Sequence, residues 1–334
     1  MKLLSIIIPV YNGIKYISRC LDSIYATDIS LNIFEVICVD DCSTDNSVDL
    51  IKEYQSKYEN LYLICHDVNK RQGGAKNSGV DIARGKFIAF VDQDDTIDRC
   101  HFEKLMFSDY LNINDLDVIV FKFCLESSDS IFTENGLTIE TPFVETGIQF
   151  CEKYLNPAFS FAPWTNWYRR SYWECNKFKY AENVLWEDAD LIAKVLFCAK
   201  TIQFVPITMY NWHYNVASIS HTINHKILAD RVFYIYRKYL VAVELKASSL
   251  AFFNILIKDI NHNISCVRKI WRLSFKDRIL FYEGLKKYNI PSFDNIVDDK
   301  FSVFILNHRK LVLSVLIFIA PLLELAKVIK QSMK

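Results

Sequence analysis

Short apolar runs alternate with amphipathic segments along the first hundred residues of the chain. The runs are rich in β-branched and aromatic residues, which predicts buried strands. Between them apolar residues recur at helical spacing, first at Ile17, Leu21 and Ile24, which predicts helices. Alternating strands and helices predict a mostly parallel sheet with helices on both faces. The four predicted strands are 3–10, 34–39, 61–65 and 87–91.

Polar residues collect where each predicted strand ends. In open parallel sheets, ligands bind at the carboxyl ends of the strands. We therefore expect the functional site at this edge of the sheet. The sequences there are YNG at 11–13, DDCSTDNS at 40–47, NKRQGGAKNSG at 69–79 and DQDD at 92–95.

Three carboxylates follow the fourth predicted strand, at Asp92, Asp94 and Asp95. Like charges this close destabilise a fold unless a cation or hydrogen-bond donors neutralise them. Asp92 and Asp94 are two positions apart, so they project to the same side if the backbone stays extended. This pattern favours a divalent cation bound to a diphosphate, and solvated loop aspartates are the alternative.

Two further carboxylates, Asp40 and Asp41, close the second predicted strand. One of them could accept a hydrogen bond from a nucleobase N–H or a ribose hydroxyl, as acidic groups at strand ends do in nucleotide-binding sheets. The alternative is a plain turn in which Ser43, Thr44 and Asp45 cap the next helix.

The segment NKRQGGAKNSG combines glycines with basic residues. Gly73 and Gly74 allow positive φ and a close backbone approach, so we expect a loop there. Lys70, Arg71 and Lys76 are candidates to meet phosphate.

The pattern changes twice farther along the chain. From about 106 to 225 it loosens into shorter strands and aromatic-rich segments, and from 226 it is helical almost throughout. Near the C-terminus the uncharged stretch 311–323 has 13 residues. This is short of the roughly 20 that cross a bilayer, and lysines follow it, so we predict an amphipathic helix lying on a membrane surface. Packing on the rest of the chain or on a second copy is the alternative.

Composition limits the possible classes. The chain has 334 residues, 51% of them hydrophobic, and no net formal charge, which argues against disorder and against nucleic-acid binding. Its ten scattered cysteines form no CxxC pair and indicate the reduced thiols of a cytosolic protein. The first apolar run is too short for a signal peptide and stops at Pro9, so it is interpreted as a strand.

Taken together, these segments resemble glycosyltransferase family 2, the inverting GT-A-fold enzymes that use nucleotide sugars. The resemblance covers roughly residues 3–225 and implies a Rossmann-like, mixed but mostly parallel sheet sandwiched by helices. It implies a catalytic domain over 1–225, with a nucleotide-binding half (1–105) and an acceptor half (106–225). A helical C-terminal region would follow over 226–334. The matching segments are SIIIPVYNG at 5–13, VDDCSTDNS at 39–47, QGGAKNSGVDIARGKFIAFVDQDD at 72–95 and WEDADL at 186–191.

The resemblance also implies roles for single residues. Pro9, Tyr11 and Asp41 would line the nucleobase pocket, with Asp41 contacting the base. Lys76 would bind the nucleotide, and Asp92 the ribose or the metal.

The metal and the catalytic base are implied in the same way. Asp94 would be the principal ligand of a magnesium or manganese ion that bridges the diphosphate, and His221 is a weaker candidate ligand. Asp188 would be the general base, with Glu187 as its rival. The family usually has glycine where this chain has Cys42, which leaves the local turn open.

Direct displacement at a sugar carbon needs a base for the incoming hydroxyl and positive charge for the departing diphosphate. A carboxylate base works better when burial raises its pKa, and Trp186 could supply an apolar wall beside Asp188. Trp186 could equally stack on an acceptor sugar or belong to the core. Arg169 and Arg170 could reach phosphate or lie on the surface.

The expected function is transfer of a sugar, from a UDP-sugar first of all, to a hydroxyl of a lipid-linked or polysaccharide acceptor. This would serve capsule, exopolysaccharide or O-antigen synthesis, on the cytoplasmic face of the cell membrane, with a homo-oligomer possible. The alternatives are a sugar nucleotidyltransferase and a catalytically inactive nucleotide-sugar binding module.

Overall fold

The structure is a computed structural model of the chain, and its contacts divide it into two compact units, Met1–Val216 and Ala217–Lys334. The predicted division at residue 225 into a catalytic domain and a helical region stays a prediction. The structure describes residues 2–113, 115–127, 132–155, 162–215 and 224–267, with Ser274, Lys276, Asp277, Leu280 and Tyr288 beyond them.

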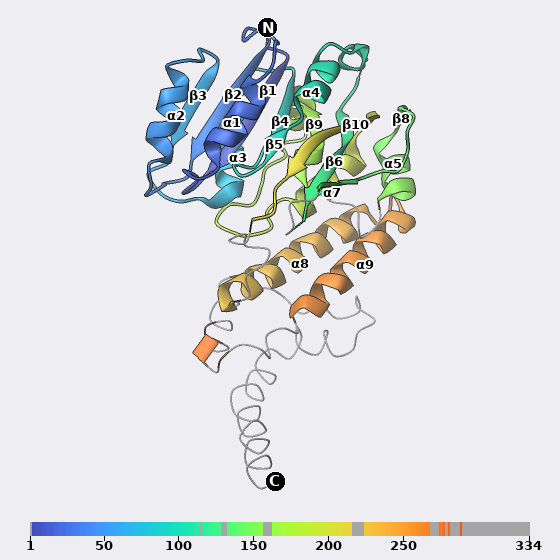
Figure 1. Cartoon of the computed structure of the whole chain (residues 1–334). Helices are drawn as coiled ribbons and strands as arrows, with labels where there is room; N and C mark the ends of the chain where they lie inside the picture. The colour runs from blue at the N-terminus through green and yellow to red at the C-terminus, as the bar shows by residue number, and fades with distance from the viewer. Residues whose placement is uncertain are drawn as a thin grey trace, which may run out of the picture. The chain divides into compact units, whose positions relative to one another are not determined.

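The first unit is built on one mixed sheet, which has ten strands in the described residues (Figure 1). The order is β3-β2-β1-β4-β9-β6-β10-β5, with β7 paired to β6 and β8 to β10. The strands are β1 Leu4–Val10, β2 Phe34–Asp40, β3 Leu61–Cys65, β4 Phe87–Phe90, β5 Thr96–Ile97, β6 Val118–Glu126, β7 Phe132–Asn135, β8 Phe143–Glu145, β9 Asn166–Arg169 and β10 Ile202–Trp212.

Helices connect and cover these strands. In the first unit they are α1 Ile17–Tyr25, α2 Ser47–Gln55, α3 Arg71–Ile82, α4 Arg99–Met106, α5 Gly147–Tyr154, α6 Arg170–Cys175 and α7 Ala189–Cys198. Two short 3₁₀ turns occupy Asp109–Asn112 and Pro163–Thr165. The four predicted strands are confirmed, and β1 to β4 are parallel to one another as the alternating pattern predicted. The second half of the sheet is mixed, because β9 runs antiparallel to both β4 and β6.

Alternate residues of the central strands face two different layers. Ile6 and Ile8 of β1 belong to the core cluster that includes Ile17 of α1. Ile7 points to the other face, where α3 passes so close that a Cβ added at Gly79 would lie 2.4 Å from the Ile7 Cγ2. The sheet is therefore buried on both faces, which explains why its strands are continuous apolar runs.

Pro9 lies inside the central strand β1, where proline is uncommon. Ile7 accepts from Val91 on the β4 side, and residues two apart point the same way, so the missing N–H of Pro9 also faces β4. The β1–β4 register ends at Ile7 and Phe90, before Pro9 is reached. The strand therefore loses no ladder hydrogen bond at Pro9.

The glycine-rich segment is helical, so the prediction of a loop there is wrong. Gly73 and Gly74 lie in the first turn of α3, and the positive φ occurs at Arg71 instead, at 63°. The close approach was predicted correctly, because a Cβ at Gly73 would lie 2.1 Å from the backbone oxygen of Ala181. Gly73 thus lets the start of α3 contact the segment that leads to α7.

The second unit contains two described helices that pack on each other, α8 His225–Leu245 and α9 Leu250–Val267. Lys238 and Asp259 form a buried ion pair between them, and the Tyr234 hydroxyl joins both side chains. Within the described residues no helix is long and apolar enough to span a membrane. The predicted surface helix near the C-terminus lies outside the described residues.

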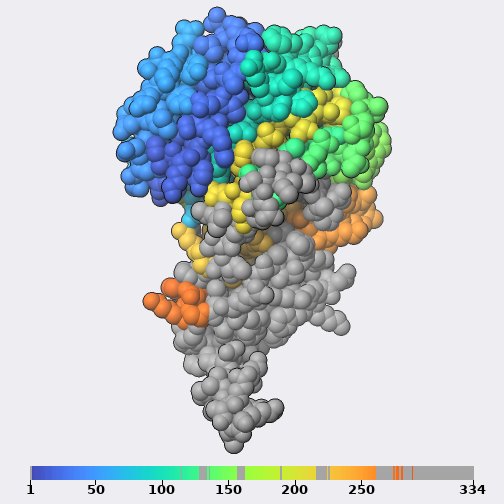
Figure 2. Space-filling view, in the orientation of Figure 1, coloured from blue at the N-terminus to red at the C-terminus, as the bar shows by residue number. Residues whose placement is uncertain are grey.

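The space-filling view shows part of the first unit's surface (Figure 2). There β10, in yellow, reaches the surface next to the green segment that contains β8 and α5. This agrees with the antiparallel pairing of β10 with β8.

Candidate functional site

The carboxyl ends of β1, β2 and β4 meet at one edge of the sheet, because these strands are parallel neighbours (Figure 1). Hydrogen bonds join the loops that follow them. Asp41 N donates to the Val10 oxygen at 2.7 Å, and Asn12 N donates to the Ser43 hydroxyl at 2.9 Å. The edge is therefore a connected structure in which residues from all three loops have fixed relative positions.

Tyr11 occupies this edge with a largely exposed side chain, 48% accessible. Its backbone exchanges two hydrogen bonds with the Gln93 side chain, from Tyr11 N to Oε1 at 3.0 Å and from Nε2 to Tyr11 O at 3.1 Å. The amide of Gln93 thus continues the β1–β4 pairing after the strands diverge. This leaves the Tyr11 ring available as a flat surface, whereas the predicted pocket residue Pro9 is buried in β1.

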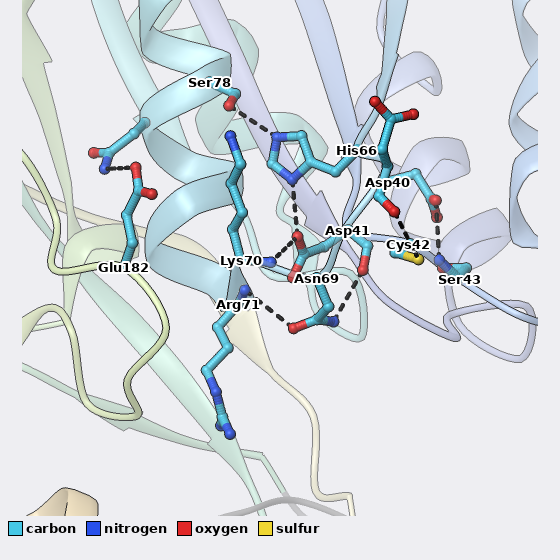
Figure 3. Close-up of polar contacts among 12 residues, drawn as sticks. Asp40, Asp41, Cys42, Ser43, His66, Asn69, Lys70, Arg71, Ser78 and Glu182 are labelled. Carbon is cyan, nitrogen blue, oxygen red and sulfur yellow. Dashed lines mark hydrogen bonds and ion pairs between the residues drawn. The ribbon is translucent and has the colours of Figure 1, made fainter. Parts of the chain in front are cut away.

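The two carboxylates after β2 have different environments (Figure 3). Asp40 accepts from Ser43 N at 3.0 Å, which closes the turn, and its buried Oδ1 has no partner within the described residues. Asp41 Oδ1 accepts from Lys70 N at 2.7 Å and from the His66 ring at 2.8 Å. No described residue contacts Asp41 Oδ2 by a hydrogen bond, so that oxygen can accept one from a ligand.

His66, the first residue after β3, was not predicted from the sequence. Its Nδ1 contacts Asp41, and its Nε2 lies 2.9 Å from the Ser78 hydroxyl of α3 (Figure 3). Its position could have indicated it, because His66 directly follows a predicted strand, as the other polar clusters do.

The acidic cluster after β4 separates into carboxylates with different partners. Asp95 is buried and accepts from the Tyr210 hydroxyl at 2.6 Å and from His213 N at 2.8 Å, so it fastens the loop to β10. Asp92 Oδ1 accepts from the Gln72 amide at 3.3 Å. Burial raises the pKa of Asp92 to about 6, with Lys76 opposing the shift. The charge of Lys76 therefore only partly compensates the negative charge of Asp92.

Asp94 lies beside the segment that follows β10. Its Oδ2 accepts from the side-chain amide of Asn215 at 3.0 Å, and its backbone oxygen accepts from Arg19. The Tyr16 hydroxyl donates in turn to Asn215 Oδ1 at 3.4 Å. The side chain of the predicted principal metal ligand is thus held by the neutral amide of Asn215.

Lys76 is almost fully buried, and its Nζ lies 2.8 Å from Oε1 of Glu187, itself only 4% exposed. The same ammonium lies 5.2 Å from the centre of the Tyr180 ring. Burial alone would lower the pKa of Lys76, but Glu187, Asp92 and Asp188 together raise it. Lys76 was predicted to bind the nucleotide, and that role stays a prediction. In this structure its charge is paired with Glu187.

Asp188 immediately precedes α7 and makes no capping hydrogen bond with its side chain. Burial, and next Glu187, raise its pKa from 3.8 to about 7, with Lys76 opposing. Glu187, the rival base, is engaged by Lys76. The arrangement therefore favours Asp188 as the group that exchanges a proton near neutral pH.

Backbone strain collects around the same edge. Five of the seven described non-glycine residues with positive φ flank the strand ends or the start of α7. Cys42 has φ 68°, so the turn is formed with cysteine where glycine would be unstrained. Trp186 has φ 52°, which is rare for a bulky residue. This backbone conformation sets the course of the chain into the two carboxylate residues that follow. The five are Asn12, Cys42, Arg71, Asn183 and Trp186.

The described carboxylates at this edge offer a divalent cation only a partial set of ligands. Within the described part of the chain no three His, Cys, Asp or Glu side chains form a group that could hold a metal. Asp92 and Asp94 offer the hard oxygens that Mg²⁺ and Mn²⁺ prefer, and Mg²⁺ is commonly held by one or two carboxylates plus substrate phosphates. The residues fit a metal that arrives with a diphosphate. His221 lies outside the described residues.

The two candidate phosphate arginines serve the fold. Arg169 donates to backbone oxygens of Leu116 and Ile113. Arg170 donates to the Gly85 oxygen and pairs with Glu174. Both guanidinium groups thus hold neighbouring backbone in place, a role that was not among the two expected for them, and contact with phosphate stays a prediction.

Comparisons with known proteins give consistent results. The family described as Glycosyl transferase family 2 matches residues 5–174, which is half of the chain. A poly(ribitol-phosphate) β-glucosyltransferase of Bacillus spizizenii is 47% identical over 95 residues, 28% of this chain and 15% of that protein. The match to a putative glycosyltransferase, EpsH, of Bacillus subtilis is 28% identical and covers 67% of this chain and 64% of that protein, so the chain spans less than two thirds of the length of these relatives.

The solved structures similar to this one include two that hold a nucleotide sugar. The crystal structure of S. aureus TarS 1-349 in complex with UDP-GlcNAc has a TM-score of 0.66 and 22% identity, and the match covers 95% of this chain and 87% of that one. The mannosyltransferase PcManGT from Pyrobaculum calidifontis, in complex with GDP-Man and Mn²⁺, has a TM-score of 0.51 and 15% identity, covering 85% and 72%. At these identities the likeness shows the fold.

The buried pair predicts a specific pattern of stabilities. Lys76→Met alone is expected to lower the free energy of unfolding by about 3–5 kcal/mol, because the buried charge of Glu187 loses its partner. Glu187→Gln alone should lower it by less, because the introduced side chain is uncharged. The double variant should recover part of that loss, since Glu187 no longer leaves an unpaired charge, while Asp92 and Asp188 still lack the charge of Lys76. Urea unfolding followed by circular dichroism measures all four proteins. Additive losses in the double variant would contradict a coupled pair.

Proposed function

Because the chain belongs to glycosyl transferase family 2, we propose that it transfers a sugar from a nucleotide-diphosphate sugar to an acceptor hydroxyl, with inversion at the sugar carbon. The resemblance drawn from the sequence motifs is confirmed by the family match, and the expected GT-A fold by the likeness to TarS. The assignment of single residues to the reaction is part of the proposal.

The observation that carries the proposal is the group of Lys76, Glu187, Asp188 and Asp92. Lys76 pairs with Glu187 at 2.8 Å, and the pKa of Asp188 is raised to about 7. A general base is most effective when its pKa lies near the working pH. The site thus has a carboxylate matched to removing a proton from a hydroxyl at neutral pH.

Asp188 takes the proton of the acceptor hydroxyl as its oxygen attacks the sugar carbon from the side opposite the leaving diphosphate. Lys76 holds Glu187 and so keeps the start of α7 in place. Tyr11 offers its exposed ring to the nucleobase, and Asp41 accepts a hydrogen bond from it.

Asp94, with Asp92 beside it, would hold a magnesium or manganese ion together with the donor. When bound, such an ion neutralises charge that develops on the departing diphosphate. The neighbour crystallised with GDP-Man and Mn²⁺ supports this cofactor, and the one with UDP-GlcNAc supports a UDP-sugar as donor.

The acceptor is proposed to be a hydroxyl of a cell-surface polymer or of its lipid-linked precursor. The relative named for poly(ribitol-phosphate) supports a polyol-phosphate chain of the teichoic acid type. Capsule, exopolysaccharide and O-antigen remain members of the same broader class. A second copy of the chain as partner stays a prediction.

The catalytic base gives a pH prediction. A carboxylate must be ionised to accept a proton, so kcat/KM is expected to fall about tenfold per pH unit below about pH 7 and to level off above it. Asp188→Asn should lower kcat by about 10²–10⁴-fold. Release of UDP from a UDP-sugar, with a polyol-phosphate acceptor, measures both. The control Asp81→Asn, an exposed carboxylate on α3, should leave both unchanged, and a flat profile would contradict the assignment.

The metal gives a binding prediction that needs no turnover. Mn²⁺ is expected to tighten UDP binding to the wild type, measured by calorimetry, and Asp94→Ala should remove about 10–100-fold of that gain. Asp49→Ala, on the exposed surface of α2, is the matched control. Equal binding of UDP with and without Mn²⁺ would argue against a metal-dependent site.

Attachment to the inner face of the cell membrane is proposed from the sequence of residues 311–334. The full chain is expected to float with vesicles that contain phosphatidylglycerol. The variant with Lys327→Glu and Lys330→Glu should float less, because it loses attraction to anionic lipid. Failure of the wild type to float would overturn this part of the proposal without affecting the sugar transfer.

A further inference from the structure

The carboxylate after β2 is held by a chain of hydrogen bonds that the transfer reaction does not use. The chain runs from the Ser78 hydroxyl on α3, through both ring nitrogens of His66, to Oδ1 of Asp41 (Figure 3). We propose that His66 is a positioning residue that makes Asp41 select uridine over cytidine nucleotides. The inference rests on the proposed function and names the specificity of its donor site.

The direction of the hydrogen bonds follows from their ends. Asp41 Oδ1 is a carboxylate oxygen, so the His66 Nδ1, 2.8 Å away, carries the hydrogen and donates. In the neutral ring Nε2 then accepts from the Ser78 hydroxyl at 2.9 Å. The side chains of His66 and Asp41 are only 7% and 4% exposed, so water does not compete strongly for these contacts.

Two donors share the same oxygen of Asp41. Besides His66, the backbone N–H of Lys70 donates to Oδ1 at 2.7 Å, and Asn69 Nδ2 donates to the Asp41 backbone oxygen at 2.9 Å. These contacts fix the carboxylate plane at the end of β2. The engagement of Oδ1 leaves Oδ2 as the oxygen that can accept from a ligand.

An accepting oxygen distinguishes the two pyrimidines by their edges. Uracil presents an N3–H donor, which can bind Asp41 Oδ2. Cytosine presents the N3 lone pair at that place, and its only donor on this edge, the exocyclic N4 amino group, lies to one side, so a carboxylate that cannot shift is left facing the lone pair. A site that recognises its ligand through buried polar groups strongly rejects a ligand that cannot pair with them, because an unpaired buried group costs binding free energy. The selection requires a fixed carboxylate, and His66 is the side chain that fixes it.

The test uses two substitutions that each keep one end of the imidazole. In His66→Asn the side-chain amide can occupy the place of Nδ1 and still donate to Asp41. In His66→Gln the longer amide reaches the place of Nε2 and contacts Ser78, but not Asp41. The affinities of UDP and CDP for the full chain with Mn²⁺ are measured by calorimetry, and thermal unfolding checks that each variant is folded.

The wild type is expected to bind UDP at least about tenfold more tightly than CDP. His66→Gln should weaken UDP about tenfold and leave CDP nearly unaffected, whereas His66→Asn should keep the ratio within about threefold of the wild type. His101→Gln is the matched control, because His101 lies 2.9 Å from Asp98 in a half-exposed pair at the start of α4. It should leave the ratio unchanged.

Three results would overturn the inference. One is an unchanged ratio in both His66 variants, which would make His66 only a structural residue. Another is an equal loss of UDP and CDP affinity in His66→Gln. The third is equal binding of UDP and CDP by the wild type. If the folded wild type binds no nucleotide diphosphate of a wider panel, the proposed function itself fails, and this result is distinguishable from the other three.

Discussion

The ammonium of Lys76 lies among the carboxylates of Glu187, Asp92 and Asp188, and the arrangement of the candidate site depends on it. Lys76 comes from α3 and Glu187 from the segment before α7, so their contact joins two parts of the unit that are 111 positions apart in the sequence. A buried ion pair contributes little net stability but strongly disfavours any arrangement that separates it. Its effect here is to fix where α7 begins.

One ammonium does not neutralise three carboxylates. Burial and, after it, this excess of negative charge raise the pKa of Asp92 to about 6 and that of Asp188 to about 7. At neutral pH the site can relieve this excess by holding a proton or by accepting positive charge with a ligand. A carboxylate that can take up a proton near neutral pH and an affinity for a cation that arrives with a ligand would both follow from this charge imbalance.

The sequence predicted the positions of the strands and the edge at which the polar loops meet, because apolar runs and the parallel topology determine both. Asp92 and Asp94 were singled out because carboxylates that follow a strand are conspicuous, and Asp188 because its segment, WEDADL, resembles the family. Single contacts across the fold were not predictable. Nothing local shows that Gln93 pairs with the backbone of Tyr11, or that His66 contacts Asp41, since their partners are 82 and 25 positions away.

Non-glycine residues in the left-handed backbone conformation explain why the glycine-rich segment was wrongly predicted to be a loop. The sequence offers Gly73 and Gly74 where a turn is needed, yet the positive φ occurs at Arg71, two residues before Gly73, and Gly73 serves the approach of α3 to Ala181. The same occurs at Cys42, which bends the chain without glycine. Such residues keep a strained φ only when neighbouring contacts hold it, as the bonds from Lys70 N and Asn69 to Asp41 do beside both turns. The strain and the hydrogen bonds around Asp41 therefore belong to one structure, which fixes the acceptor that a nucleobase would meet.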